Sequence, residues 1–231
     1  MLEFRNIYAG YGKIPIIQDV SARLKEGAIT SVLGPNGSGK STLFKTIFGL
    51  AKVFSGSILF QGTDITNLSN YKVVRLGISY VPQVDNVFPN LTVKENLEIV
   101  SDEKTNLKEN LQRIYELFPI LKERSNMKAV KLSGGERQML AVGRALMTDP
   151  KLLILDEPSV ALSPKLSEML YQRIIELNKV GVTIALIDQN VRKALQVSED
   201  TIVLLSGRIV YSGSSKEIDE EIWSKLVLGK R

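Results

Sequence analysis

The sequence contains no cysteine and no histidine among its 231 residues. Without cysteine there can be no disulfide, no thiolate nucleophile and no Cys-ligated zinc. Without histidine, the Ser-His-Asp triad and nearly all zinc chemistry are excluded as well. Any catalysis must therefore use carboxylates, lysine, hydroxyls, amides and backbone N–H groups, and phosphoryl chemistry is prominent among the reactions that such a set performs.

Clustered positive charge and long apolar runs are also scarce. Lys and Arg together number 30 and Asp and Glu 25, for a net charge of +5, and the two signs are interspersed. A nucleic-acid groove would need clustered basic residues with aromatic ones between them, so we expect no nucleic-acid partner. No run approaches the roughly 18 apolar residues of a membrane span, and the charged first residues do not resemble a signal peptide. We therefore expect no direct membrane insertion.

The second half of the chain alternates apolar runs with helix-like segments. Strands are expected at 152–156, 183–188 and 201–205, and helices at 135–147, 164–179 and 191–197. Continuous Val, Ile and Leu runs that alternate with helices indicate a parallel sheet covered on both faces, and hence an α/β fold. Short β-like runs occupy the N-terminal part (2–8, 14–24 and 57–60), and a helical segment is expected at 216–228. The region from about 84 to 129 is helix-prone and lacks buried-strand runs.

A phosphate-binding motif follows the apolar run 28–33 and precedes an expected helix at 40–50. Residues 34–42 match G-x-x-x-x-G-K-[ST], in which the glycines allow successive N–H groups to turn inward and form an anion nest at a helix N-terminus. Lys40 is expected to reach the β- and γ-phosphates, Ser41 to hold Mg²⁺, and Thr42 to contact the α-phosphate. The alternative is a glycine-rich turn that opens a helix by chance. A chance turn would not be expected to match all nine residues of the motif. The candidate nucleotide-binding residues here are Gly34, Pro35, Asn36, Gly37, Ser38, Gly39, Lys40, Ser41 and Thr42.

Two carboxylates end the apolar strand expected at 152–156. Ligands bind at the carboxyl edge of a parallel sheet, so Asp156 and Glu157 are expected beside the phosphate loop. Asp156 is placed to hold Mg²⁺, and Glu157 to act as general base toward the attacking water. Two acids that merely solvate a strand end are the alternative.

The segment Leu132-Ser133-Gly134-Gly135-Glu136 matches the LSGGQ/E signature of the ATP-binding cassette (ABC) ATPase family, which the chain resembles over essentially its whole length. On the residues alone, Ser133 and the glycine N–H groups form a second anion-binding cap at a helix start. The resemblance implies that Ser133, Gly134, Gly135 and Glu136 face the γ-phosphate of an ATP held by a second ABC subunit, either a copy or a paralogue. It also implies ATP and Mg²⁺ as cofactors.

The resemblance further implies a P-loop NTPase fold of the ABC type within a single domain, 1–231. Its RecA-like mixed-sheet core, at about 1–83 and 150–231, would include an N-terminal antiparallel β subdomain, and an α-helical subdomain would be inserted at about 84–149. Tyr11 matches the aromatic residue that stacks on adenine, although alone it would read as a core or turn tyrosine. Gln83 matches the glutamine that touches Mg²⁺ and water, although alone it would read as a loop residue. Residues 84–97 would contact a membrane permease.

Two positions depart from the family pattern. Ser163 stands where the family usually has Asp, and by spacing Gln189 stands where the family has a switch histidine. Glutamine can donate a hydrogen bond to a γ-phosphate oxygen but carries no proton that titrates near neutral pH. The candidate catalytic residues are therefore Glu157, Gln189 and Lys40, and the candidate metal ligands are Ser41, Gln83 and Asp156.

These departures are similar to the pattern of cassettes that serve branched-chain amino acid uptake. The expected function is the ATP-binding subunit of an ABC importer, which hydrolyses ATP at a dimer interface to drive uptake of branched-chain or other hydrophobic amino acids. Such a subunit would bind permeases at the cytoplasmic face of the cell membrane. The alternatives are a cassette for urea or amide uptake, one for lipopolysaccharide export, a soluble ABC ATPase outside transport, and a regulatory cassette that scarcely hydrolyses ATP.

Overall fold

The computed structural model describes residues 1–84, 86–100, 106–160 and 162–228. They fall into two compact units: unit 1 contains Met1–Leu76 and Thr183–Arg231, and unit 2 contains Gly77–Val182. The expected division into a core and a helical subdomain at about 84–149 stays a prediction. Among the described residues, no helix is both long and apolar enough to cross a membrane.

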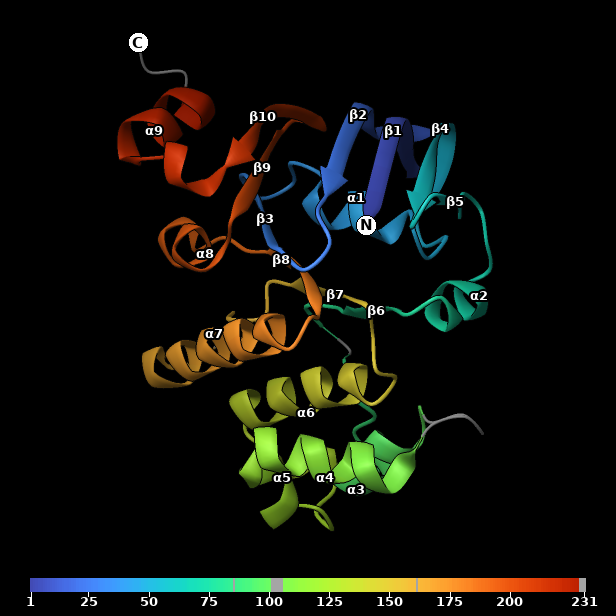
Figure 1. Cartoon of the computed structure of the whole chain (residues 1–231), viewed down its shortest axis with the longest axis vertical. Coiled ribbons are helices and arrows are strands. Elements are labelled where there is room, and N and C mark those ends of the chain that lie inside the picture. The colour runs from blue at the N-terminus through green and yellow to red at the C-terminus, as the bar shows by residue number, and fades with distance from the viewer. Residues whose placement is uncertain (85, 101–105, 161, 229–231) are drawn as a thin grey trace. The chain divides into compact units, whose positions relative to one another are not determined.

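The N-terminal part of unit 1 is an antiparallel sheet with the strand order β2-β1-β4-β5 (Figure 1). Its strands are β1 (Leu2–Tyr11), β2 (Ile14–Leu24), β4 (Lys52–Phe60) and β5 (Thr63–Asp64). The apolar side chains of β1, among them Leu2, Phe4 and Ile7, are buried. Phe4 meets the ring of Phe44 edge to face, with centroids 5.7 Å apart, and so joins the sheet to helix α1 (Lys40–Lys45).

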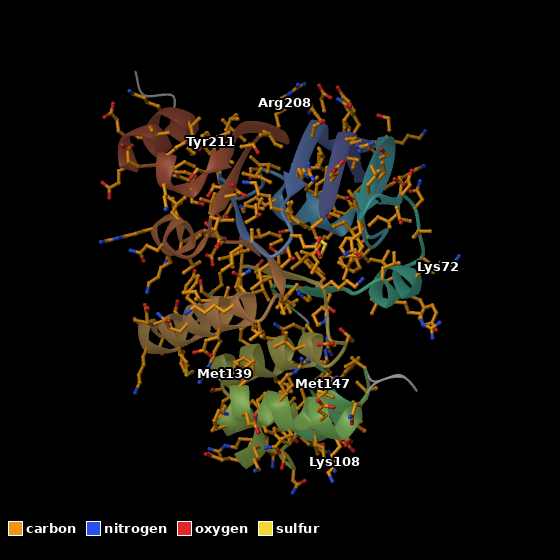
Figure 2. The ribbon with its side chains drawn as sticks, viewed as in Figure 1. Lys72, Lys108, Met139, Met147, Arg208 and Tyr211 are labelled. Carbon is orange, nitrogen blue, oxygen red and sulfur yellow. The ribbon has the colours of Figure 1, made fainter. Side chains whose placement is uncertain are left out.

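The rest of unit 1 is built on four strands in the order β10-β9-β3-β8. They are β3 (Ile29–Leu33), β8 (Thr183–Ile187), β9 (Asp200–Leu205) and β10 (Arg208–Ser214). β3 pairs in parallel with both neighbours, and every residue of β3 and β8 is buried, as expected for continuous apolar strands. On β10, Arg208 and Tyr211 (Figure 2) each make a polar contact, Arg208 with Gln18 of β2 and Tyr211 with Glu217. The remaining elements of unit 1 are α2 (Asn70–Arg75), α8 (Val191–Val197), the 3₁₀ helix η2 (Ser215–Glu217) and α9 (Glu220–Leu228).

Unit 2 combines two parallel strands with a group of helices (Figure 1). The strands are β6 (Ile78–Val81) and β7 (Leu152–Asp156), and the helices are α3 (Val93–Glu98), α4 (Leu107–Leu117), α5 (Pro119–Glu123), the 3₁₀ helix η1 (Ala129–Lys131), α6 (Gly134–Leu146) and α7 (Pro164–Lys179). Helix α6 packs against α3, α4 and α5. A Cβ atom on its Gly143 would lie 3.0 Å from Ile114 of α4, so the glycine allows this close approach. Met139 and Met147 (Figure 2) bury their side chains in the same packing.

Two helices are shorter than their sequence patterns predict. The helix expected at 40–50 ends at Lys45, because the Thr46 hydroxyl donates to the carbonyl of Leu43 and the following amides form tighter i→i−3 bonds. The segment expected at 216–228 begins its α-helix only at Glu220. Asp219 explains this start, since its carboxylate accepts the N–H of Ile222 at 2.8 Å and caps the helix.

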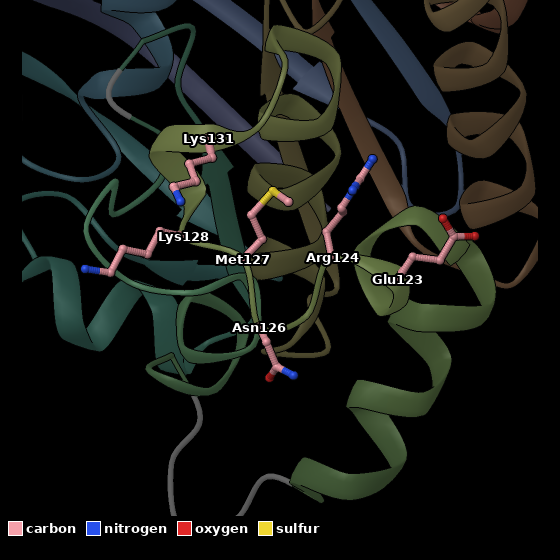
Figure 3. Close-up of a pocket in the computed structure, with 6 residues that line it drawn as sticks. All are labelled: Glu123, Arg124, Asn126, Met127, Lys128 and Lys131. Atoms are coloured by element: carbon pink, nitrogen blue, oxygen red, sulfur yellow. The ribbon is translucent and has the colours of Figure 1, made fainter.

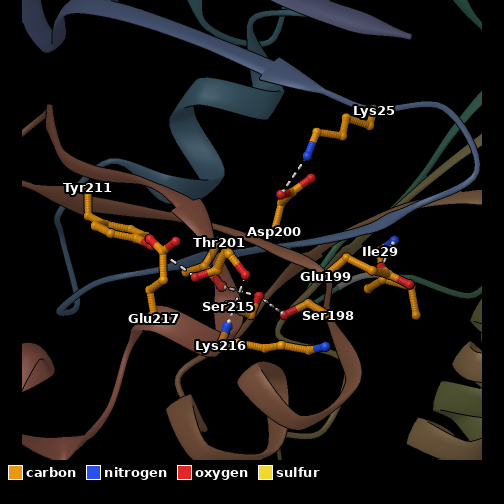
Figure 4. A network of polar contacts seen from close by, with 11 residues as sticks. Lys25, Ile29, Ser198, Glu199, Asp200, Thr201, Tyr211, Ser215, Lys216 and Glu217 are labelled. Carbon is orange, nitrogen blue, oxygen red and sulfur yellow. Dashed lines mark hydrogen bonds and ion pairs between the residues drawn. The ribbon is translucent and has the colours of Figure 1, made fainter.

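Four hydroxyls in unit 1, from β3, β9, η2 and the residue Ser198 before β9, form a ring of hydrogen bonds (Figure 4). Ser31 lies 2.6 Å from Thr201, Thr201 lies 2.7 Å from Ser215, Ser215 lies 2.9 Å from Ser198, and Ser198 lies 3.0 Å from Ser31. Ser31, Thr201 and Ser215 are buried, so solvent has little access to replace a lost partner. This ring of hydrogen bonds ties the strand that leads to the phosphate loop to the C-terminal part of the unit.

Replacement of Thr201 by valine keeps the side-chain shape and removes one hydroxyl from this ring. We expect Thr201→Val to lower the free energy of unfolding by about 1–3 kcal/mol, because Ser31 and Ser215 lose a buried partner. Urea denaturation followed by circular dichroism measures the change. Thr63→Val, at an exposed position of β5, is the matched control and should stay within about 0.5 kcal/mol of the wild type. Equal losses in the two variants would contradict the role given to the ring.

Candidate functional site

The phosphate loop of unit 1 joins β3 to α1 and needs glycine at defined positions. Gly34, Gly37 and Gly39 have φ values of +148°, +75° and +102°, a region that side chains with a Cβ atom disfavour. At Gly34 a Cβ atom would also lie 2.2 Å from the carbonyl oxygen of Leu204, a contact that no real Cβ makes. The loop therefore brings its backbone closer to β9 than any other residue would permit.

Lys40 opens α1, and its side chain lies over the loop. It is only 4% exposed, and its Nζ donates to the carbonyls of Gly34 at 2.9 Å and Pro35 at 3.0 Å. The buried hydroxyl of Ser38 has no hydrogen-bond partner among the residues that the structure describes. A phosphate oxygen is an acceptor that such a buried hydroxyl can use, so this loop fits an anionic ligand.

Gln189 follows β8, the parallel neighbour of β3, in which Ile187 pairs with Val32. Because β3 and β8 are parallel, Gln189 and the phosphate loop both follow their strands at the same edge of the sheet. The side chain of Gln189 is exposed, while its backbone N–H donates at 2.7 Å to the buried carboxylate of Asp188, which also accepts the N–H of Asn190 at 2.9 Å. Asp188 was not among the predicted site residues, although an acid directly after a buried strand is a visible signal for one.

Tyr11, the predicted adenine-stacking residue, ends β1 at the turn into β2, where it pairs with Ile14. Its side chain is 44% exposed, so the ring is accessible. A contact with adenine stays a prediction.

In unit 2 the predicted Mg²⁺ ligand Asp156 and the predicted general base Glu157 lie at the end of β7. Asp156 is 3% exposed and Glu157 8% exposed, and Glu157 has a φ of +49°, an uncommon value for a residue other than glycine. The amide of Gln83 donates to Glu157 Oε2 at 2.8 Å. Gln83 and Glu157, which were predicted separately as site residues, are thus in direct contact.

Tyr80 is a residue of this site that sequence reasoning missed. Its hydroxyl donates to Asp156 Oδ2 at 2.6 Å. The two residues are 76 positions apart, and only the parallel pairing of β6 with β7, with Tyr80 opposite Ile154, brings them together. No local pattern signals that contact.

The signature residues form the N-terminal cap of α6. Ser133 is the N-cap and accepts the N–H of Glu136 at 3.3 Å, while the Glu136 carboxylate accepts the N–H of Ser133 at 2.8 Å, which completes a capping box. A Cβ atom on Gly135 would lie 2.5 Å from Cδ1 of Leu166 on α7, so a larger residue there would require the Leu166 side chain to shift. The contact of these residues with a nucleotide stays a prediction.

The chain that leads from α5 to the signature lines an open cavity of about 510 Å³ (Figure 3). Its lining includes the cations Arg124, Lys128 and Lys131. Figure 3 shows Arg124 and Lys128 extending in opposite directions, and Arg124 faces the Glu136 carboxylate at 3.7 Å. These cations do not converge on one point as a phosphate site would require.

The predicted site residues therefore fall into two groups. Unit 1 holds Tyr11, the loop 34–42 and Gln189, and unit 2 holds Gln83, the signature 133–136 and the pair Asp156 and Glu157. The predicted Mg²⁺ ligands offer a hydroxyl, an amide and a carboxylate. Oxygen donors of this kind suit Mg²⁺, which is commonly held by one or two carboxylates together with substrate phosphates. The donor set fits the metal, and the individual roles stay predictions.

The comparison with known families defines the class of protein. The ABC transporter family profile matches residues 17–160. The chain belongs to the ABC transporter family, as the signature predicted. MJ1267, described as an ATP-binding cassette of an ABC transporter, has a solved structure with a TM-score of 0.89 and 29% identity, over 99% of this chain and 97% of that one. The predicted fold class is thereby confirmed.

Among curated relatives, the probable branched-chain amino acid transport ATP-binding protein LivF of Archaeoglobus fulgidus is 45% identical over 99% of both chains. The high-affinity branched-chain amino acid transport ATP-binding protein BraG of Pseudomonas aeruginosa is 43% identical over 91% of both. The lipopolysaccharide export system ATP-binding protein LptB of Haemophilus influenzae is 32% identical over 100% of this chain and 98% of its own. A second solved cassette, MJ0796, has a dimeric structure with a TM-score of 0.83 and 26% identity, over 94% of this chain and all of its own.

The geometry of Gly34 gives a direct test of the phosphate loop. In Gly34→Ala the new Cβ must displace the loop or the Leu204 carbonyl, so we expect ATP affinity to fall about tenfold or more. Titration with a fluorescent ATP analogue measures the affinity. Gly37→Ala is the matched control, because its φ is also positive but its Cβ would meet nothing within 4 Å. A loss in Gly37→Ala as large as that in Gly34→Ala would show that close approach to β9 is not what matters.

Proposed function

We propose that this chain is the ATP-hydrolysing subunit of an ABC importer for branched-chain or other hydrophobic amino acids. The observation that carries the proposal is the 45% identity to LivF over 99% of both chains, supported by the 43% identity to BraG. The 32% identity to LptB favours lipopolysaccharide export as a second candidate, on a more distant relationship.

The chemistry that we propose follows from the site residues. Gly34–Thr42 cradle the phosphates of ATP through backbone N–H groups, and Lys40 turns from the loop carbonyls to the β- and γ-phosphates. Ser41, Asp156 and Gln83 are the residues that would hold Mg²⁺, and the ion would neutralise charge on the phosphates. Glu157 accepts a proton from the attacking water, and Gln189 donates a hydrogen bond to a γ-phosphate oxygen. Because phosphoryl transfer depends mainly on positioning and charge stabilisation, glutamine at the switch position is compatible with hydrolysis.

The partners that we propose are a second ABC subunit and membrane permeases. The dimeric structure of MJ0796 supports a second cassette subunit as partner. The family resemblance implies that the signature of one subunit would then meet the nucleotide of the other. The capping box of Ser133 and Glu136 holds that end of α6 in shape before any partner is present. Residues 84–97 are the proposed permease surface, where Val84 and Phe88 expose apolar side chains and Asp85 lies outside the described residues. We place the assembly at the cytoplasmic face of the cell membrane.

The general-base assignment is tested by Glu157→Gln. We expect this variant to bind ATP with wild-type affinity and to hydrolyse it at least about 100-fold more slowly, because the amide cannot accept the proton of water. Phosphate release gives the rate. Size-exclusion chromatography with ATP should show an accumulated dimer. Normal turnover in Glu157→Gln would remove Glu157 from the role of base.

A second variant, Gln189→Ala, tests the proposed role of Gln189 by the same measurement of the hydrolysis rate. It removes one hydrogen bond to the γ-phosphate and leaves the base in place, so we expect slower but measurable hydrolysis. An unchanged rate in Gln189→Ala would remove Gln189 from the mechanism, and it would leave the assignment of Glu157 untouched.

The transport function is tested by recovery of the tagged chain with its natural partners. We expect polytopic membrane proteins to co-purify, and vesicles that contain this complex to take up radiolabelled leucine in an ATP-dependent manner. Labelled urea, tested in the same vesicles, is the control substrate for the alternative of urea uptake. Uptake of urea without leucine would move the chain to urea import, and co-purification with ribosomes or DNA would contradict a transport function.

A further inference from the structure

We propose that Tyr80 is a positioning residue that fixes the Asp156 carboxylate for Mg²⁺, an inference that rests on the proposed ATPase function. Tyr80 matches none of the predicted site residues. Its assignment comes from one contact in unit 2, the hydrogen bond of 2.6 Å from its hydroxyl to Asp156 Oδ2.

The strand register explains why this contact forms. Tyr80 pairs with Ile154 in the parallel ladder of β6 and β7, and Asp156 lies two residues further along β7. Side chains two residues apart on a strand point to the same face, at a spacing of roughly 6.6 Å. A tyrosine that leans along the strand spans this distance, whereas a shorter side chain with a hydroxyl would not. The bond is therefore built into the pairing of two buried strands rather than into a loop.

The chemistry of the bond suits the orientation of a metal ligand. A hydroxyl that donates to a carboxylate makes a charge-assisted hydrogen bond, which is shorter and stronger than a neutral one. An ionised carboxylate has about four acceptor positions, so it can accept from Tyr80 and still bind a cation. Partners of this kind that hold metal-binding side chains typically contribute 10- to 100-fold to metal affinity.

Together with the contact of Gln83 with Glu157, each carboxylate has a donor from β6 or from the loop that follows it. Gln83 lies in the loop after β6, whereas Tyr80 lies within the strand and is partly buried. Tyr80 is thus held by the sheet, and its hydroxyl gives Asp156 a fixed direction. Tyr80 is therefore a support within the sheet for the proposed metal ligand, whereas Gln83 contacts Glu157 from a loop.

The test is Tyr80→Phe in the full chain, which keeps the ring and removes only the hydroxyl. We expect the Mg²⁺ concentration for half-maximal ATPase activity to rise about 10- to 100-fold. We also expect the affinity for Mn²⁺ in the presence of ADP, measured by electron paramagnetic resonance, to fall by a similar factor. The affinity for the ATP analogue in EDTA should not change, because the phosphate loop does not depend on this hydroxyl.

Tyr71→Phe is the matched control. Tyr71 is 64% exposed and its ring lies under the guanidinium of Arg75, so loss of its hydroxyl should leave every one of these measurements unchanged. Unchanged Mn²⁺ affinity in Tyr80→Phe would overturn the proposal. An equal loss of nucleotide binding in EDTA would overturn it as well, since it would show a general structural role. If the wild type hydrolysed no ATP, the proposed function would fail, and the Mn²⁺ comparison would still decide the role of Tyr80.

Discussion

Burial of parallel strands determines where this protein can place polar side chains. Every residue of β3, β7 and β8 is buried, and their interiors are apolar apart from hydroxyls. Charged groups can therefore appear only where each strand ends and the chain leaves the sheet. In unit 1 the phosphate loop follows β3 and Gln189 follows β8 soon after it ends, while in unit 2 Gln83 follows β6 and Glu157 follows β7 directly. One constraint thus locates four of the site segments.

The carboxylates at these strand ends are buried, and each has defined donors. Asp156 accepts from the hydroxyl of Tyr80, Glu157 from the amide of Gln83, and Asp188 from two backbone N–H groups. A buried charge without such donors would be costly, so these bonds make the charged site compatible with the fold. The same bonds fix the direction of each carboxylate, which is what a metal or a water molecule would recognise.

The sequence predicted those parts of the molecule that local patterns determine. The strand 152–156 follows from an apolar run that ends in Asp156, the strand 29–33 follows from a mainly apolar run, and the place of the glycine loop follows from its motif. The bond between Tyr80 and Asp156 could not be predicted, because it depends on the register of strands about 70 residues apart. The early end of α1 could not be predicted either, but here the cause is local. It depends on the hydroxyl of Thr46 and on a single turn, which helical periodicity does not show. Asp188 lies between these two cases, because an acid directly after a buried strand is a local pattern that indicates a site residue.

The absence of histidine affects how the site can respond to its surroundings. Histidine is the side chain whose ordinary pKa lies closest to neutrality, and this chain has none; the family resemblance predicts Gln189 in the place of a switch histidine. The backbone of Gln189 is fixed by Asp188, while its side chain is exposed, so its amide can turn toward a ligand without a change of charge. Recognition at this position would then depend on geometry alone. At the signature, too, recognition would depend on geometry. The capping box of Ser133 and Glu136 sets the shape of the surface that we propose a second subunit meets.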